Sequence, residues 1–152
     1  MNSADTVRAF MKAIEDKDWD KAASYLSDDF AFIGPFPQPA GRDATIASYK
    51  ELLWAMPNWR FNVHDVEELP DGRVSARVNI TGTQTGQLAV PVLGVPPIAP
   101  TRKRIALPEE NLIYTLRNGK VSKLEVAAVR GGGLQGILSQ LGVALPAGVT
   151  GY

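Results

Sequence analysis

The spacing of the hydrophobic residues changes once along the chain, at Pro57, and this change restricts the possible folds more than any other feature. Before Pro57, apolar side chains recur every three or four residues, as they do from Val7 to Ile14, which is typical of amphipathic helices. After it, apolar and polar side chains alternate, as they do from Val74 to Thr81, which is typical of strands with one buried face. The sequence therefore predicts an α+β fold in which helices come first and a mainly antiparallel sheet follows.

Capping residues place three helical segments before Pro57. Ser3 begins the first, Asp18 the second and Asp43 the third, because short polar side chains accept hydrogen bonds from the free N–H groups of a first helical turn. Pro57 ends the third segment, since proline disfavours helical geometry in the residue before it. A short strand over residues 30–33 is expected between the second and third helices.

Two turn motifs divide the second half of the chain into long strands. They are Pro-Asp-Gly at 70–72 and Asn-Gly at 118–119, the latter a strong hairpin signal. Three glycines at 131–133 end the last strand, and a short amphipathic helix over 134–141 follows. The expected strands are 59–64, 74–81, 102–117 and 120–129.

These strands must curl around the first and third helices to bury the apolar faces of both. We therefore expect a cone-shaped, curved antiparallel sheet wrapped around the N-terminal helices. A single domain would cover residues 1–145, the last helix would close the wide mouth of the cone, and residues 146–152 would form a flexible tail. A tapered apolar cavity inside such a cone is the natural place for a ligand.

The composition excludes several classes of function. The 152 residues carry 16 basic and 16 acidic side chains, so no basic excess favours nucleic acid. No cysteine is present, and the one histidine, His64, lies beside Asp65 and is expected at the surface. With no phosphate-binding glycine loop either, we expect neither a metal nor a cofactor.

No apolar run approaches the ~20 residues of a membrane-spanning helix, and the first residues lack the pattern of a signal peptide. We therefore expect a cytoplasmic protein with no membrane partner. The uncharged, proline-rich segment Leu88–Pro100 is unusually apolar for a connection. Two alternatives remain for it: a loop packed on its own domain or on a partner, and a lid over a hydrophobic ligand.

Several short motifs occur in a characteristic order: Trp19 and residues 25–30, 41–43, 56–61, 71–74, 81–86, 100–105, 118–121 and 138–142. In this order and spacing they resemble the SnoaL-like polyketide cyclase group of the nuclear-transport-factor-2-like superfamily, from about residue 7 to residue 142. The resemblance implies the cone-shaped fold and a homodimer joined through the outer faces of the two sheets. It also implies an acidic residue near the end of the last strand that closes a ring by intramolecular aldol chemistry.

The chain departs from the cyclase pattern at the site. Cyclases of this group often carry a tryptophan shortly before the acidic residue and a histidine in a Gly-Thr-His-Thr-Gly turn. Here Glu125 stands at about the place of the tryptophan and Gln84 at the place of the histidine, while no carboxylate occupies the usual acid/base position. By the resemblance, Gln84 would present its amide to a ligand.

Two glutamates are the candidates for proton transfer. Glu125 is surrounded in sequence by apolar residues, an environment that suits an acid/base catalyst, although it could instead face outward and pair with Lys123 or an arginine. Alternation along the strand puts Glu110 on the face opposite to Glu109 and Asn111, so at least one carboxylate must face the cone. The break at Pro108 prevents the sequence from deciding which one, and Glu110 is the second candidate.

The cavity is expected to be lined by aromatic and aliphatic side chains with a few polar groups that orient a ligand. Two functions remain open: a cofactor-free cyclase or isomerase acting on a polyketide- or steroid-like carbonyl compound, and a non-catalytic ligand-binding or dimerisation module. The expected ligand-binding residues are Phe10, Ile14, Phe32, Trp54, Trp59, Gln84 and Asn111.

Overall fold

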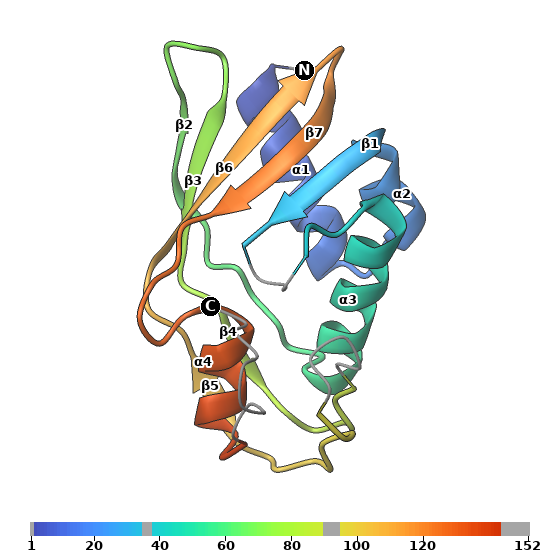
Figure 1. Ribbon diagram of the computed structural model, residues 1–152, viewed down its shortest axis with the longest axis vertical. Helices are drawn as coiled ribbons and strands as arrows, with labels where there is room; N and C mark the ends of the chain where they lie inside the picture. Colours follow the sequence, from blue (N-terminus) through green and yellow to red (C-terminus); the bar gives the residue numbers. More distant parts are fainter. Residues whose placement is uncertain (1, 35–37, 90–94, 144–152) are drawn as a thin grey trace.

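The structure is a computed structural model that describes residues 2–34, 38–89 and 95–143 (Figure 1). Its elements follow the predicted order, with helices first and strands afterwards. They are α1 (Ser3–Glu15), α2 (Trp19–Ser24), β1 (Leu26–Ile33), α3 (Arg42–Ala55), β2 (His64–Glu68), β3 (Val74–Val78), β4 (Thr81–Thr83), β5 (Arg104–Ala106), β6 (Glu110–Arg117), β7 (Lys120–Val126) and α4 (Gly133–Gln140). The expected tail at 146–152 lies outside the described residues.

A curved five-stranded sheet forms the body of the molecule, with the strand order β1-β7-β6-β3-β2. The predicted α+β class is confirmed, and β2, β3, β6 and β7 pair antiparallel as the turn motifs indicate. The first strand is the exception, since β1 runs parallel to β7 and places Ile33 opposite Glu125. A parallel pair needs a long crossover connection, which α3 and the intervening strands supply here.

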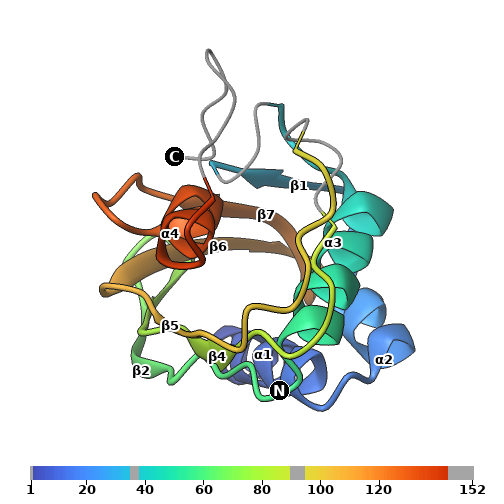
Figure 2. The same ribbon diagram turned by 90° about the horizontal axis from the view of Figure 1, so that it is seen from below.

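The helices cover the concave side of this sheet. In Figure 2, which looks at the molecule from below, α1 and α3 lie on the inner side of the strands, and α4 lies at the near end. The buried face of α1 contains Val7, Phe10, Met11 and Ile14, all at most 2% exposed. This face is the one that the helical spacing predicts, and it packs into one continuous core with the inward residues of the strands.

Two of the three helix starts differ from the prediction. Asn2, rather than Ser3, caps α1, and its side chain accepts a hydrogen bond of 2.8 Å from the N–H of Asp5. Asp18 caps α2 as predicted, whereas α3 begins after Gly41 without a side-chain cap, so that Asp43 lies in its first turn.

All four strands predicted after Pro57 are also shorter or broken. The strand predicted over 74–81 ends at Val78, with Thr81 already in β4, and the one predicted over 120–129 ends at Val126. The stretch 59–63 is extended but forms only one bridge, between Arg60 and Thr81, and β2 begins at His64. The predicted strand 102–117 is divided by residues 107–109 into β5, which pairs with β4, and β6, which belongs to the large sheet. Pro108 lies in this break, where a missing N–H is tolerated.

The apolar segment Leu88–Pro100 packs on its own domain through part of its described residues, while Pro96, Pro97, Ala99 and Pro100 are exposed. Leu88, Val95 and Ile98 are buried, and Leu88 forms a bridge with Ile98. Residues 90–94 lie outside the described part of the chain. None of the helices in the described part is long and apolar enough to cross a bilayer.

Candidate functional site

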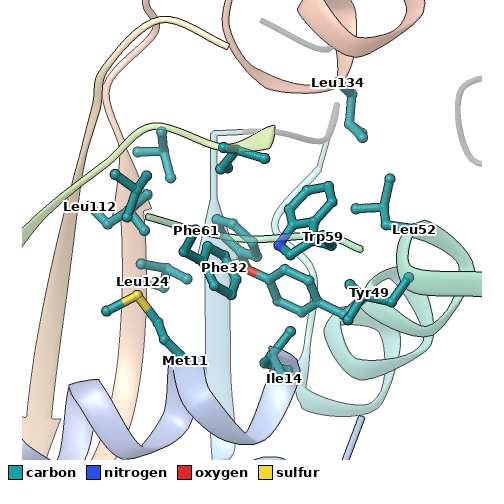
Figure 3. Close-up of a cluster of buried hydrophobic side chains, with 14 of the residues drawn as sticks. Met11, Ile14, Phe32, Tyr49, Leu52, Trp59, Phe61, Leu112, Leu124 and Leu134 are labelled. Carbon is teal, nitrogen blue, oxygen red and sulfur yellow. The ribbon is translucent and has the colours of Figure 1, made fainter. Parts of the chain in front are cut away.

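An apolar cavity of about 60 Å³ lies inside the cone, between α3, the inner face of the sheet and α4. Phe32 of β1, Leu112 of β6 and Val126 of β7 line the sheet side, and α4 contributes Leu134 and Ile137. Figure 3 shows part of this lining, with Leu134 approaching from α4 and Leu52 from α3. The C-terminal helix therefore forms part of the cavity wall.

One face of α3 supplies the opposite wall. Thr45, Ser48, Tyr49 and Leu52 all line the cavity, and their spacing of three and four residues puts them on one side of the helix. Trp59 and Phe61, which follow the helix, complete this wall with their rings packed edge to face at 5.8 Å. The wall thus combines aromatic rings with three hydroxyl groups, those of Thr45, Ser48 and Tyr49, and an indole N–H.

Glu110 is the one charged side chain among the described residues that line the cavity, and it is 2% exposed. It begins β6 on the same face as Leu112 and Tyr114, which are buried, while Asn111 and Ile113 face outward. Its Oε1 accepts a hydrogen bond of 3.1 Å from the N–H of Gly133, the first residue of α4. This bond and the partial positive charge of the helix start offset part of the cost of burying a carboxylate.

The negative charge of Glu110 acts on the phenol beside it. Burial raises the pKa of Tyr49 well above its usual range, and the charge of Glu110 raises it further. Burial likewise raises the pKa of Tyr114, whose ring, like that of Tyr49, packs edge to face on Phe10. Both phenols are therefore protonated and neutral at neutral pH.

Three buried polar atoms have no hydrogen-bond partner within the part of the chain that the structure describes. They are Thr45 Oγ1, Trp59 Nε1 and Tyr114 Oη. Two of the three residues, Thr45 and Trp59, line the cavity. Leaving such an atom unpaired costs about 1–3 kcal/mol, so each of them calls for a physical explanation.

The other catalytic candidate, Glu125, lies on the outer face of the sheet. Leu124 and Val126 point inward, so alternation turns Glu125 the other way, where it lies across from Ile33 and Ile113. It lines a shallow groove on the outer surface and is separated from the cavity by the sheet itself. The structure thus brings Glu110, and not Glu125, to the interior.

Of the seven expected ligand-binding residues, Phe32 and Trp59 line the cavity. Phe10 and Ile14 are fully buried in the core but do not reach the cavity. Asn111 lies on the outer face and accepts a hydrogen bond of 2.7 Å from Ser75 Oγ. Trp54 is 72% exposed and lines a groove on the outer side of α3.

Gln84 is buried, but its amide serves the fold. The Nε2 group donates to the backbone carbonyls of Gly86, Ile98 and Ala99 at 3.1–3.2 Å. Its Oε1 accepts from the N–H and the hydroxyl of Thr101 at 3.1 and 2.7 Å. With both amide atoms engaged, Gln84 holds the two ends of the 86–101 segment together instead of facing a ligand.

The sequence prediction missed several lining residues, among them Thr45, Ser48, Leu52, Leu134 and Ile137. Their signal was present in the helical spacing of α3 and α4, but two of them are small polar residues that do not stand out as cavity lining. As to metals, no three acidic or histidine side chains of the described residues come together as a metal site requires.

Comparison with known proteins agrees with this architecture. A family model described as a SnoaL-like domain matches residues 7–124. No curated protein matches the chain.

Three crystal structures illustrate the likeness of the fold. A candidate polyketide cyclase from Pseudomonas putida has 18% identity and a TM-score of 0.69, over 95% of this chain and 99% of that one. A candidate SnoaL-like polyketide cyclase from Jannaschia has 22% identity and a TM-score of 0.69, over 92% and 91%. An NTF2-like protein of unknown function from Cytophaga hutchinsonii has 20% identity and a TM-score of 0.56, over 84% and 90%.

Proposed function

The chain belongs to the SnoaL-like family, and we propose that it binds an apolar, polyketide- or steroid-like carbonyl compound in the interior cavity and transfers a proton on it without a cofactor. The observation that carries this proposal is Glu110, a buried carboxylate in a cavity whose other walls hold no charge among the described residues. A positioned carboxylate shielded from water is the group that such chemistry needs. Several similar structures are described as candidate polyketide cyclases, which supports the same reaction class.

The proposed chemistry conserves all atoms and electrons. The Glu110 carboxylate takes a proton from a carbon next to the ligand carbonyl, the C–H electron pair forms the double bond of an enolate, and the carbonyl π electrons move to the oxygen. In an isomerase, the ligand has a carbon–carbon double bond next to the carbon that loses the proton, so the intermediate is a conjugated dienolate. The oxygen electrons re-form the carbonyl, the enolate double bond shifts one position to become the new C=C, and the electrons of the original C=C take the proton from Glu110 at its far carbon. In a cyclase, the enolate carbon attacks a second carbonyl of the same molecule, and Glu110 gives the proton to the resulting alkoxide.

A second function, a ligand-binding module without chemistry, is favoured by two observations. Glu110 already has a structural partner in the N–H of Gly133, and the cavity of about 60 Å³ is smaller than the ~300–1,000 Å³ of typical ligand pockets. A ligand with several rings therefore requires the wall to move, and α4 is the short element that borders the cavity. The two functions share the cavity and differ only in whether Glu110 moves a proton.

The experiment starts with thermal-shift screening of aromatic polyketides, steroids, flavonoids and simple aryl ketones such as 1-tetralone. For a ketone that binds, hydrogen–deuterium exchange at the carbon next to the carbonyl is then followed by NMR in D₂O. We expect the wild type to accelerate exchange and Glu110→Gln to lose at least about 100-fold of that acceleration. Glu125→Gln is the matched control, since it removes a carboxylate on the outer face and should keep the wild-type rate.

The outcomes separate the two functions. Exchange that is unaffected by Glu110→Gln would remove Glu110 as the base. A ketone that binds the wild type without accelerated exchange would establish the binding module instead. No thermal shift with any of the apolar compounds would overturn both.

A further inference from the structure

Two hydrogen-bond donors of the cavity wall have no partner in the described part of the protein. The indole Nε1 of Trp59 and the hydroxyl of Thr45 are both buried, and their residues are 3% and 0% exposed. They come from neighbouring parts of the chain, Thr45 from the first turns of α3 and Trp59 from the segment that follows α3. Both residues line the same cavity as Glu110.

An indole N–H can only donate a hydrogen bond, and a hydroxyl can both donate and accept. The group that satisfies Trp59 must therefore be an acceptor. Figure 3 shows the indole nitrogen of Trp59 turned toward the aromatic cluster of Phe32, Tyr49 and Phe61, and not away from the cavity lining. The ring carbons offer no strong acceptor, and the hydroxyl of Tyr49 does not accept a hydrogen bond from this N–H in the described part of the protein, so the N–H is available to a molecule that enters the cavity.

The charge of the cavity limits what this molecule can be. An anionic acceptor would be repelled by the buried carboxylate of Glu110, and the pKa of Tyr49, raised in part by that charge, reflects the same effect. A cation would find a carboxylate but would have to leave water for an almost entirely apolar wall. A neutral molecule with an acceptor oxygen, such as a ketone or an enone, satisfies the donors without either cost.

We propose that Trp59 Nε1 and Thr45 Oγ1 form an oxygen subsite that makes the cavity selective for neutral carbonyl compounds over hydrocarbons of the same shape. This inference rests on the proposed function and adds to it the atoms that recognise the ligand oxygen. The ring of Trp59 is fixed by edge-to-face packing on Phe61, so the donor is held in place before a ligand binds. In this arrangement the donors hold the carbonyl oxygen and Glu110 faces the rest of the ligand.

A pair of probes that differ by one oxygen tests the subsite. 1-Tetralone and tetralin have nearly the same shape, and only the first carries a carbonyl group. Their dissociation constants are measured by NMR titration with the wild type, Trp59→Phe and Thr45→Val. We expect the wild type to bind the ketone at least about tenfold more tightly than the hydrocarbon, and each variant to reduce this ratio at least about threefold. The ratio is the readout because any ring contact that Trp59→Phe removes is lost for both probes.

Trp54→Phe is the matched control, because Trp54 is 72% exposed and lies outside the cavity. It should keep the wild-type ratio. Thr45→Val is an independent readout if Trp59→Phe does not fold, since valine closely matches threonine in shape. An unchanged ketone-to-hydrocarbon ratio in the variants that fold would overturn the proposal and assign the two donors to bound water. A wild type that binds both probes equally, or that binds neither, would also overturn the proposal.

The test distinguishes this inference from the catalytic proposal. A ketone preference that depends on Trp59, without deuterium exchange by the wild type, would keep the subsite and remove the catalysis. Deuterium exchange that depends on Glu110, with no preference for the ketone, would keep the catalysis and remove the subsite. Glu110→Gln should still prefer the ketone, because the proposed donors are intact in that variant.

Discussion

The Oε1 atom of Glu110 accepts a hydrogen bond of 3.1 Å from the N–H of Gly133, so the carboxylate proposed to move a proton also holds the start of α4. Gly132, which precedes this helix, lies so close that an added Cβ would be 3.0 Å from the same oxygen. The candidate base is therefore in direct contact with the start of the helix that forms part of the cavity wall. We expect a substitution of Glu110 to affect the local stability of α4 before that of any other element.

We expect Glu110→Ala to loosen α4 before it loosens the sheet. Losing a hydrogen bond to a charged group costs about 1.5–3 kcal/mol, which corresponds to an at least about tenfold larger equilibrium constant for the local opening of the helix. Amide hydrogen exchange of the α4 residues 134–140 should accelerate by that factor, while the amides of β7 change little. Equal acceleration in both elements would show a global loss of stability and would contradict a local anchor.

A matched pair of substitutions within α4 tests its tight packing. An added Cβ at Gly136 would clash with the carbonyl oxygen of Gly131, so the backbone would have to move. Gly136→Ala should therefore lower the free energy of unfolding by about 2 kcal/mol or more, even though alanine favours helices. Gln135→Ala, at an exposed position of the same helix, should leave the free energy of unfolding unchanged or raise it slightly. Chemical denaturation measures this free energy for both variants. Equal effects of the two would show that the Gly131–Gly136 contact is not close in solution.

How well the sequence predicts each part depends on whether the decisive interaction is local. The inward face of α1 follows from the spacing of its own residues, and the end of α3 follows from Pro57. The break at Pro108 divides a strand between two sheets, and this outcome depends on which partners the strand finds elsewhere in the fold. The same break left the direction of Glu110 undecided from sequence.

The outward direction of Glu125 and of Trp54 follows from the periods of their elements. Leu124 and Val126 flank Glu125, and if their apolar side chains point inward, strand alternation turns Glu125 outward. Trp54 follows the inward residue Leu52 by two positions, which is about 200° around a helix, so its ring points to the opposite side. In both cases the period of the element, and not the apolar character of the neighbours in sequence, determines the direction of the side chain.

The role of Gln84 could not have been seen in the sequence. Its partners Ile98, Ala99 and Thr101 lie 14 to 17 positions away, and only the folded chain brings them together. Buried polar networks of this kind depend on tertiary packing, and no local pattern marks them.

The only histidine of the chain offers a direct test of the surface electrostatics. His64 Nε2 lies 2.8 Å from Glu109 Oε1 and Nδ1 lies 3.2 Å from the carbonyl of Asn62, and these contacts, together with the charge of Asp65, raise the pKa of His64 above its usual 6.5. The contribution of this pair to stability is therefore fully present below about pH 6.5 and is lost as the pH rises through the raised pKa. An NMR titration of the single imidazole signal should show the raised value, and Glu109→Gln should return it toward 6.5. A midpoint at or below 6.5 in the wild type would contradict the pairing.

The outer face of the sheet is where we expect a second copy of the chain to bind. Ile33, 38% exposed, and the half-buried Ile113 flank Glu125 there, and the family resemblance implies a homodimer through this face. Analytical ultracentrifugation should give twice the chain mass of 16.4 kDa, and Ile113→Lys should shift the protein toward the monomer. Trp54→Lys, which alters an exposed apolar residue on a different surface, is the control and should stay dimeric. A wild-type monomer at micromolar concentration would remove the prediction.

Thr45→Val should make the protein more stable while it weakens ketone binding. The hydroxyl of Thr45 is buried without a partner among the described residues, so its removal relieves a desolvation cost of about 1–3 kcal/mol, and valine fills nearly the same space. The loss of helix propensity on this exchange is small, because both side chains are β-branched. Without ligand, the midpoint temperature of thermal unfolding should therefore be higher for Thr45→Val than for the wild type, and the stabilisation by saturating 1-tetralone should be smaller.

Thr83→Val is the control. Thr83 is half-buried and its hydroxyl accepts a hydrogen bond of 3.2 Å from Asn58 Nδ2, so this variant should be less stable and should respond to the ketone as the wild type does. If Thr45→Val destabilises the protein as much as Thr83→Val does, the hydroxyl of Thr45 has a partner in solution, and it is not held free for a ligand.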